Sequence, residues 1–392
     1  MNSGFYAFDA ENTCLPLSMK EITKTDNQWM KQALQLAEKG KGYVSPNPLV
    51  GCVIVDKQGE EIGSGYHQKF GVAHAEVNAV AKIKDKNRLQ GATVYVTLEP
   101  CSHTGKTPPC ADMLATFPLK KVVIAMKDPN PKVNGTGIRI LKNAGFEVEV
   151  GVLEKEAEKL NEFFIHHQTF GRPLVTLKIA QTVDGFLAAA DGNSQWISGK
   201  QSRKRVHEWR KEYDAVMVGR TTAMADNPSL TVRHVAGRQP QRIVIDGPFE
   251  LPRNMNLFSD KYEEKTIILT WNKEASKDAA DPMLKVLSQN YFRGEIVQTS
   301  KMDGHVDLRQ AFKILGEKGI TSVLVEGGQQ LSSALIKQGL ADKLCVFIAP
   351  KLLGSGTRSV LNIGIHKMNE IAELKEVTWE KVGDDMLLTG YF

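Results

Sequence analysis

The stretch Thr97-Leu-Glu-Pro-Cys-Ser-His-Thr-Gly-Lys-Thr-Pro-Pro-Cys110 ends a predicted strand and carries two cysteines, Cys101 and Cys110. His74-Ala-Glu76 precedes it in the chain. One imidazole and two thiolates are three good zinc ligands, and a water would occupy the fourth position. Zinc lowers the pKa of such a water, so that hydroxide is supplied near neutral pH. The pattern therefore predicts a zinc centre formed by His74, Cys101 and Cys110.

A zinc-bound hydroxide can replace an amino group on a pyrimidine ring, a hydrolytic deamination. This reaction needs a second group that moves protons from the water to the ring nitrogen and to the leaving ammonia. Glu76 lies beside a ligand and is the candidate for this role. The same constellation, with a glutamate that is not a ligand, occurs in zinc deaminases. Residues i and i+2 do not share a helix face, so His74 and Glu76 can converge only in a first helical turn. The apolar spacing of Val77, Val80 and Ala81 indicates that a helix starts there.

The spacing of the two cysteines leaves an alternative open. Residues 102–109 separate them, whereas the common pattern in zinc deaminases is Cys-x-x-Cys. Two small buried cysteines and a core histidine would also fit this spacing. Thr107-Pro-Pro109 opens a helix, and a helix start at Cys110 is expected to favour its thiolate.

The composition excludes several classes of protein. The chain has 392 residues, which suggests two or three domains of roughly 100–200 residues each. Its apolar share of 42% and charged share of 24% are ordinary for globular proteins. No run of about 18 apolar residues exists, so we expect no membrane span. The acidic N-terminus lacks a long apolar stretch, so we expect no signal peptide.

The five cysteines are an odd number in a long chain, so a disulfide framework is not expected. This cysteine usage favours a reducing compartment, which we take to be the cytoplasm. Cys52 and Cys345 lie within apolar strands and are expected in the core. Cys14 lies in residues 1–19, which are expected to form a flexible N-terminal extension.

The first domain is expected over residues 20–168. Its expected helices are 26–40, 74–83, 111–117 and 138–145, and its expected strands are 50–56, 59–67, 92–100, 121–127 and 146–151. Strands that alternate with helices predict a layered α/β domain with a mainly parallel sheet. A charged helix over 154–168 follows, and Gly171-Arg-Pro173 marks a domain boundary.

The second domain is expected over residues 173–392. Its expected helices are 200–212, 307–318 and 329–338, its expected strands are 174–180, 215–219, 242–246, 265–270, 322–328 and 343–350, and the tail 376–392 predicts a hairpin. Gly327-Gly328 joins a strand to a helix, an arrangement that can cradle a phosphate. It is not G-x-G-x-x-G, so a Rossmann fingerprint is absent and a plain helix start is the alternative.

Motifs in both halves point to one family. Besides the segments 74–76 and 97–110, they are Ser45-Pro-Asn-Pro-Leu-Val-Gly51, Asp128-Pro-Asn-Pro131 with Gly135 and Gly137, Lys178-Ile-Ala-Gln-Thr-Val-Asp-Gly185, Ser194-Gln-Trp-Ile197, Ala225-Asp-Asn-Pro-Ser-Leu-Thr-Val-Arg233 and Glu326-Gly-Gly328. Over residues 20–392 the chain resembles the RibD family of bifunctional riboflavin biosynthesis proteins, in which the long cysteine spacer is typical. The resemblance implies an α/β protein with a three-layer cytidine-deaminase-like domain and a dihydrofolate-reductase-like domain.

The resemblance also implies two reactions. The first is zinc-dependent deamination of 2,5-diamino-6-(ribosylamino)pyrimidin-4-one 5'-phosphate. The second is reduction of the ribosyl group by NADPH, which gives 5-amino-6-(ribitylamino)uracil 5'-phosphate. The resemblance implies that the partner is a small phosphorylated pyrimidine, and that the protein binds neither nucleic acid nor a membrane. It also implies a homo-oligomer, either a dimer or a tetramer.

Residue roles follow from the same resemblance. Asn47 would contact the pyrimidine, with His103 and Lys106 at the rim of the pocket. The implied NADPH contacts are Ala180, Trp196, Thr222, Asp226, Gly328, Gln329, Gln330, Leu331, Ser332, Ser333 and Ala334. The implied substrate contacts of the reductase are Ser194, Arg210, Leu230, Arg233 and Glu326, with Lys178 as the catalytic residue.

Each of these roles has a structural alternative. Asn47 could be a turn residue, Lys178 a strand-edge lysine, Trp196 a core residue and Asp184 a turn residue. Arg210 and Arg233 suit a phosphate because their planar guanidinium groups present forked donors. Lys178 could polarise or protonate the sugar as hydride arrives.

Two other functions compete with this interpretation. A nucleic-acid deaminase, such as a tRNA-editing enzyme, or else a nucleoside deaminase would share the zinc ligands and carry an accessory ligand-binding domain. A nucleic-acid enzyme would need a basic surface, and a net charge of +5 without Lys/Arg clusters argues against one. A purely structural zinc site would need a fourth protein ligand. None is evident in the sequence, although His103 could serve.

Overall fold

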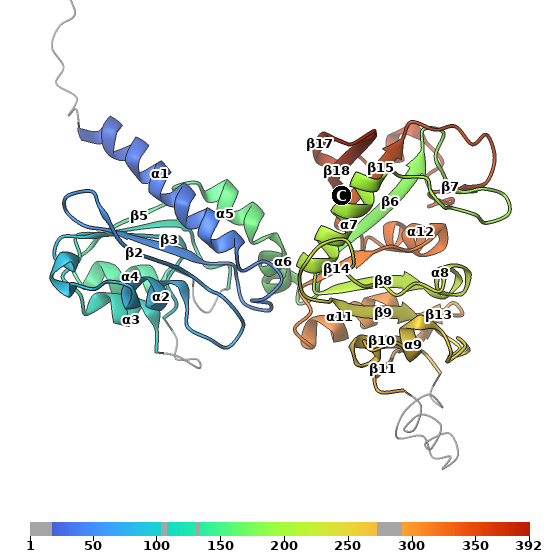
Figure 1. The fold of residues 1–392 in the computed structure, drawn as a ribbon, viewed down its shortest axis with the longest axis horizontal. Helices are drawn as coiled ribbons and strands as arrows, with labels where there is room; N and C mark the ends of the chain where they lie inside the picture. Colours follow the sequence, from blue (N-terminus) through green and yellow to red (C-terminus); the bar gives the residue numbers. More distant parts are fainter. Residues whose placement is uncertain (1–17, 103–107, 131–133, 273–291) are drawn as a thin grey trace, which may run out of the picture. The chain divides into compact units, whose positions relative to one another are not determined.

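The computed structural model describes residues 18–102, 108–130, 134–272 and 292–392, with side chains from Asp26 onward. These residues form two compact units (Figure 1). Unit 1 comprises the described residues up to Gly40 together with Leu49–Leu160, and unit 2 comprises Lys41–Pro48 together with Asn161–Phe392. None of the helices in the described part of the chain has the length and apolar character needed to cross a membrane.

Unit 1 contains a five-stranded sheet in the order β2-β1-β3-β4-β5. The strands are β1 (Gly51–Val55), β2 (Glu61–Tyr66), β3 (Thr93–Leu98), β4 (Lys121–Met126) and β5 (Glu147–Val150). β1 pairs antiparallel with both β2 and β3, whereas β3, β4 and β5 are parallel. The sheet is therefore mixed rather than mainly parallel as predicted. The reason is a tight turn, in which Asp56 accepts the backbone N–H groups of Gln58 and Glu60 and folds β2 back onto β1.

Helices cover both faces of this sheet, which confirms the predicted three-layer domain (Figure 1). They are α1 (Ser18–Glu38), α2 (Ala75–Ala81), α3 (Cys110–Ala115), α4 (Thr136–Asn143) and α5 (Glu154–Leu160), with a short 3-10 helix η1 (Lys86–Leu89). Cys52, Ile54 and Val94 face α2, α3 and α4 within one apolar cluster. α1 packs closely on β1 because Gly51 has no side chain: a Cβ there would lie 1.9 Å from the Ala33 carbonyl oxygen.

Unit 2 is built on a nine-stranded sheet in the order β11-β10-β9-β8-β14-β6-β15-β18-β17. The strands are β6 (Leu174–Thr182), β8 (Ala215–Gly219), β9 (Gln241–Ile245), β10 (Thr266–Thr270), β11 (Glu295–Gln298), β14 (Ser322–Val325), β15 (Lys343–Ala349), β17 (Lys375–Val382) and β18 (Asp385–Tyr391). All are parallel from β11 to β15. β17 and β18 form the predicted C-terminal hairpin, and β18 pairs antiparallel with β15.

Two apolar clusters lie on opposite faces of the unit 2 sheet, as alternating strand residues require. Met217 faces Phe312 and Leu335, whereas its neighbour Val216 faces Leu257. The helices are α6 (Glu162–Phe170), α7 (Lys200–Glu212), α8 (Arg220–Asp226), α9 (Asn256–Ser259), α11 (Leu308–Glu317) and α12 (Gln329–Lys337), with 3-10 turns η2 (Glu263–Lys265) and η4 (Met368–Glu370). Short strands β7 (Phe186–Ala188), β12 (Lys301–Met302), β13 (His305–Val306) and β16 (Thr357–Arg358) pair outside the main sheet.

The division of the chain differs from the predicted domains, residues 20–168 and 173–392, in two places. The helix predicted over 154–168 is two helices, α5 and α6, which are interrupted at the buried Asn161. The segment 41–48 belongs to unit 2, where Ser45 Oγ donates to Asp214 Oδ2 at 2.7 Å. Asp214 also accepts the N–H and hydroxyl of Thr321, at 2.8 and 2.7 Å.

Candidate functional site

His74, Cys101 and Cys110 come together in unit 1. His74 immediately precedes α2, Cys101 follows β3, and Cys110 is the first residue of α3. His74 Nδ1 lies 3.6 Å from Cys101 Sγ and 3.4 Å from Cys110 Sγ, and all three ligand atoms lie within 4.8 Å of one another. Zinc bonds of about 2.0–2.3 Å in a tetrahedral arrangement would place such N and S atoms about 3.5 Å apart. The three donors therefore fit a zinc ion that keeps one position open.

Glu76 lies in the first turn of α2, which begins at Ala75. Its side chain is buried, and the residue is only 3% exposed. Burial raises the pKa of Glu76 to about 7. A divalent cation at the adjacent cluster would act in the opposite direction. Glu76 is thus a buried carboxyl group that interacts with Cys110 of the cluster and whose pKa is raised in the absence of a metal.

The two thiols share one environment but differ in ionisation. The Cys110 thiol and then His74 lower the pKa of Cys101 to about 4. The neighbouring Cys101 and burial raise the pKa of Cys110. The backbone N–H of Cys110 points at Cys101 Sγ, 3.3 Å away, and so supports the thiolate of Cys101 in the metal-free cluster. A helix start that favours the Cys110 thiolate in a zinc-bound cluster stays a prediction.

Glu99 anchors the loop behind the cysteines and was not predicted as a site residue. Its buried carboxylate accepts four backbone N–H groups, from Asp128, Gly135, Gly137 and Ile138, at 2.9–3.3 Å. Gly137 allows this approach, since a Cβ there would lie 2.1 Å from the Pro100 carbonyl oxygen. The glutamate therefore ties the strand end that leads to Cys101 to the start of α4.

The structure does not test the other contacts predicted for the deaminase site. Asn47 lies in the turn 41–48, where its N–H bonds to the Val44 carbonyl oxygen at 2.9 Å. A contact between Asn47 and the pyrimidine stays a prediction. His103 and Lys106, predicted at the rim of the pocket, and Cys14 lie outside the described residues. Cys52 and Cys345 are buried, as predicted.

In unit 2, three predicted site residues form one charged cluster. Arg210 of α7 donates to both oxygens of Glu326, at 2.6 and 3.0 Å, and Lys178 Nζ of β6 lies 3.4 Å from Glu326 Oε2. Glu326 is buried; against this burial the charges of Arg210 and then Lys178 lower its pKa to about 2. Partial burial raises the pKa of Asp226, and the nearby Lys178 opposes this shift. The fork of Arg210, predicted to bind the substrate, is thus occupied by another predicted substrate contact.

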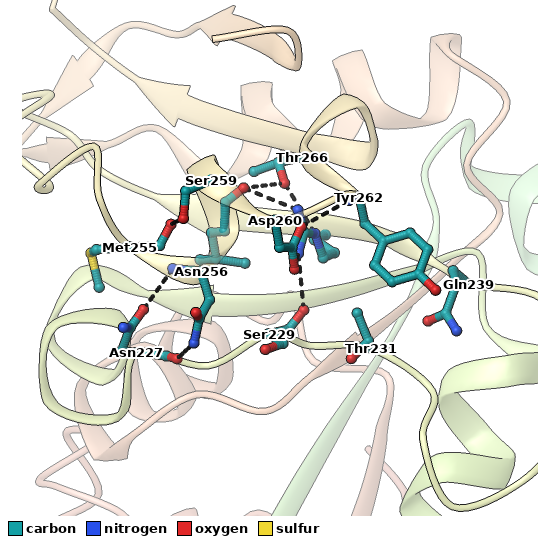
Figure 2. Close-up of polar contacts among 12 residues, drawn as sticks. Asn227, Ser229, Thr231, Gln239, Met255, Asn256, Ser259, Asp260, Tyr262 and Thr266 are labelled. Carbon is teal, nitrogen blue, oxygen red and sulfur yellow. Dashed lines mark hydrogen bonds and ion pairs between the residues drawn. The ribbon is translucent and has the colours of Figure 1, made fainter. Parts of the chain in front are cut away.

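The segment 227–233 follows α8 and lies outside any sheet, so its backbone groups need other partners. Side chains from other elements provide them. Figure 2 shows Asn256 bonded twice to Asn227, through its backbone N–H at 2.8 Å and its amide at 2.7 Å. The buried Arg242 donates to the Ser229 carbonyl oxygen at 3.2 Å and to Asp260 at 2.6 Å. None of these residues was predicted as part of the site.

The second half of the segment is held in the same way. Arg210 donates to the Thr231 carbonyl oxygen at 2.9 Å. The Gln239 amide bonds both backbone groups of Val232, at 2.7 and 3.0 Å. Leu230 adopts a left-handed φ of +50° and its side chain is buried in the core. Such strain persists only where the surroundings determine the backbone. Because the Leu230 side chain is buried, the predicted substrate contact would have to come from the backbone of this residue.

Thr222 and the predicted cofactor residues 328–334 lie together at α8 and α12. The N–H of Gly328 donates to Thr222 Oγ1 of α8 at 3.0 Å, and Thr221 Oγ1 lies 3.4 Å from the Gln330 side chain. Ser332 and Ser333 are buried, and Ser333 accepts the N–H of Leu361 at 2.8 Å. A pocket opens beside α8, lined by Arg220, Thr221, Met224 and Ala225. The other predicted members of this set are Gln329, Leu331 and Ala334, which also lie in α12.

Trp196 is not a core residue, since 62% of it is exposed. The guanidinium carbon of Arg203 lies 4.4 Å from the ring centroid of Trp196, and Lys351 donates to its carbonyl oxygen at 2.7 Å. Ser194 is half-buried in the same loop, and Ala180 packs partly buried at the sheet. Asp184 lies in the turn between β6 and β7, as considered for it, and it also accepts the N–H groups of Leu353 and Gly354 from a distant part of the chain.

The comparisons with known proteins agree with both units. Residues 23–126 match the cytidine and deoxycytidylate deaminase zinc-binding region, and residues 173–388 match the RibD C-terminal domain. The riboflavin biosynthesis protein RibD of Aquifex aeolicus is 42% identical over 94% of this chain and 98% of its own length. That of Escherichia coli K12 is 39% identical over 93% and 98%.

Solved structures show the same fold. RibD of Acinetobacter baumannii superposes with a TM-score of 0.82 at 37% identity, covering 94% of this chain and 99% of that one. A diaminohydroxyphosphoribosylaminopyrimidine deaminase/5-amino-6-(5-phosphoribosylamino)uracil reductase of Thermotoga maritima gives 0.81 at 38% identity, with the same coverage. The chain therefore belongs to the RibD family of riboflavin biosynthesis enzymes, with a zinc-binding deaminase unit followed by a reductase unit.

Proposed function

We propose that unit 1 deaminates 2,5-diamino-6-(ribosylamino)pyrimidin-4-one 5'-phosphate. We propose further that unit 2 then reduces the ribosyl group of the product. The observation that carries the proposal is the buried Glu76 beside a three-donor set that leaves one zinc position open. The two activities named for the Thermotoga maritima relative, at 38% identity, support this order of reactions.

In the deaminase, a zinc ion held by His74, Cys101 and Cys110 would supply an activated water. The chain's own part is the movement of protons. Glu76 accepts a proton from the attacking water and delivers it to the ring nitrogen. It then takes the proton of the new hydroxyl on the ring carbon and gives it to the amine, which leaves as ammonia while the carbonyl forms. Burial keeps bulk water away from its carboxyl group. Asn47 is proposed to contact the pyrimidine ring.

In the reductase, NADPH would supply the hydride. Lys178 presents an ammonium group that Glu326 holds in place at 3.4 Å. We assign Lys178 as the proton donor to the sugar oxygen or nitrogen as its carbon is reduced. Arg233 is assigned to the substrate phosphate. Among the described residues it has no carboxylate within ion-pair distance, whereas the fork of Arg210 is already occupied by Glu326.

The proposed cofactor site is the start of α12 and the facing side of α8. Gly328 caps α12 without a side-chain hydrogen bond, and a helix N-terminus of this kind favours the negative charge of a pyrophosphate. The proposed contacts are Ala180, Trp196, Thr222, Asp226 and the turn 328–334. The substrate would lie against Ser194, Leu230, Arg233 and Glu326, with Arg210 holding Glu326 rather than the phosphate.

We also propose a homo-oligomer in the cytoplasm. β17 is the edge strand of the unit 2 sheet and is exposed over residues 375–381, including Val377 and a Trp379 that is 57% exposed. An exposed edge strand with apolar side chains favours pairing with another copy. The four cysteines of the described chain are free thiols, which fits a reducing compartment. Sedimentation of wild type and Trp379→Glu tests the oligomer, which the charged variant should dissociate.

Ammonia release and NADPH oxidation on the diaminopyrimidinone ribosyl phosphate test the proposed reactions. Glu76→Gln should stop ammonia release yet oxidise NADPH when given deaminated substrate, and Lys178→Met should do the reverse. The exposed Glu60→Gln is the matched control and should retain both activities. A wild type that releases ammonia only from a nucleoside or a tRNA, and never consumes NADPH, would establish the alternative of a nucleoside or nucleic-acid deaminase with an accessory domain.

A further inference from the structure

His207 is a buried histidine inside the reductase cluster that none of the assigned roles uses. It lies on α7 one turn before Arg210, and the residue is 5% exposed. Its Nδ1 accepts the backbone N–H of Arg233 at 3.0 Å. A side chain of the helix that carries Arg210 thus holds the end of the segment 227–233.

The placement of Arg233 depends on this bond. The two preceding residues are held by Arg210 and Gln239, so His207 is the last of three clamps on consecutive backbone positions. Within the described part of the chain, the one hydrogen bond of the Arg233 side chain is a long contact, 3.5 Å, to the Thr231 hydroxyl. Its guanidinium is therefore directed by its backbone rather than by a fixed side-chain partner.

His207 must be neutral to accept this bond, with its proton on Nε2. The charged and titratable groups that face it are Arg210 on its own helix, Arg233 at the end of the segment, His234 directly after it, and Glu326 after β14. The His234 ring packs edge-on, with its centroid 4.4 Å away. Burial, followed by the charge of Arg210, lowers the pKa of His207 to about 4. The ring is therefore an acceptor throughout the neutral range.

We propose that His207 is a positioning residue of the reductase, which orients Arg233 toward the phosphate of the substrate through its backbone N–H. This inference rests on the proposed assignment of Arg233 to the phosphate. His207 itself touches neither the reacting atoms nor the cofactor in this scheme.

The test compares substitutions of His207 in the full-length enzyme, with deaminated substrate and NADPH. The Asn side-chain oxygen can take the place of Nδ1, whereas the Gln amide lies one methylene further out and Leu offers no acceptor. A lost backbone hydrogen bond predicts a rise of about tenfold in KM for the substrate with His207→Leu or His207→Gln. We expect His207→Asn to stay within about threefold of wild type. The exposed His305→Asn is the matched control and should leave KM unchanged.

A positioning role predicts a specific pattern of kinetic constants. The kcat and the KM for NADPH should change by less than about twofold, and inhibition by inorganic phosphate should weaken in step with the substrate KM. A purely structural role predicts equal effects of Asn and Gln, and losses of kcat that follow thermal stability. That second pattern would overturn the inference, and it can be read from the Asn and Gln variants even if His207→Leu does not fold.

Arg233→Met separates this inference from the assignment on which it rests. If Arg233→Met leaves the substrate KM unchanged, the phosphate assignment fails and the inference fails with it. If Arg233→Met raises KM while His207→Gln does not, the assignment stands and only the inference is wrong. If the phosphate assignment of Arg233 and the positioning role of His207 are both correct, adding His207→Gln to the Arg233→Met variant should not raise the substrate KM further.

Discussion

Replacing Glu326 by glutamine tests whether the buried charge cluster stabilises unit 2. The Glu326 side chain is only 8% exposed and has two cationic partners, Arg210 and Lys178. Glutamine keeps the shape of the side chain and one oxygen acceptor but removes the negative charge. Both cations would then remain in the cluster without the carboxylate that balances them.

Two independent arguments give the size of the effect. The pKa of Glu326 falls from 4.5 to about 2 on folding, and such a fall corresponds to about 3 kcal/mol of stability at neutral pH. Removing one partner of a buried ion pair costs about 3–5 kcal/mol in other proteins. We therefore expect Glu326→Gln to lower the free energy of unfolding of unit 2 by about 3 kcal/mol.

Tryptophan fluorescence during urea denaturation can report on unit 2 selectively. Trp29 lies in unit 1, whereas the other tryptophans, Trp196, Trp209, Trp271 and Trp379, lie in unit 2. A Trp29→Phe background therefore restricts the signal to unit 2. Glu264→Gln is the matched control, because Glu264 also faces an arginine, at 3.4 Å, but both side chains are more than 60% exposed. Its effect should stay below about 1 kcal/mol.

The pH dependence provides the refuting measurement. Because folding lowers the pKa of Glu326, its stabilisation is complete above pH 4.5 and is lost as the pH falls toward 2. The difference between wild type and Glu326→Gln should shrink from about 3 kcal/mol at pH 6 to about 1 kcal/mol at pH 3. An effect no larger than that of the control, or one that does not change with pH, would refute the reasoning.

Three further substitutions test the supports of the two sites. Glu99→Gln should destabilise unit 1 by about 3 kcal/mol, because it weakens a carboxylate that binds four backbone N–H groups; calorimetry measures this, and an unchanged transition would contradict it. Gly137→Ala should cost about 1–3 kcal/mol and reduce ammonia release, since the added methyl would lie 2.1 Å from the Pro100 carbonyl oxygen; full activity would show that the loop can move. Arg242→Met should destabilise unit 2 by about 3 kcal/mol and raise the substrate KM, because Ser229 and Asp260 lose their buried partner. Fluorescence measures the stability and steady-state kinetics measure the KM. An unchanged KM would argue against a role of the Arg242–Ser229 contact in substrate binding.

The sequence predicts the zinc centre and most regular elements well, because both depend on local patterns. The predicted helix 200–212 and strand 215–219 coincide with α7 and β8. The antiparallel orientation of β1 was not predicted, since apolar alternation specifies a strand but not its partner. The break at Asn161 was also missed, because helical periodicity continues across it.

The contacts that support the sites could not be predicted in the same way. Arg242, Gln239 and His207 act on the segment 227–233 from different elements, and no local pattern distinguishes them from surface residues. Arg210 and Glu326 are 116 positions apart in the chain. The sequence therefore predicted both as site residues but could not show that they form an ion pair with each other. The roles of the predicted site residues stay predictions until the experiments above are done.

The segment 41–48 has a consequence for how a gene of this kind could be divided. A split after codon 160 would yield a downstream polypeptide that lacks the eight residues 41–48 of its own folded unit. Asp214 would lose the Ser45 hydroxyl, one of its hydrogen-bond donors. Asp214 would keep its bonds to the N–H and hydroxyl of Thr321, so the separate reductase would lose one support of this turn. A division of the gene at this point therefore cuts through a folded unit instead of between two.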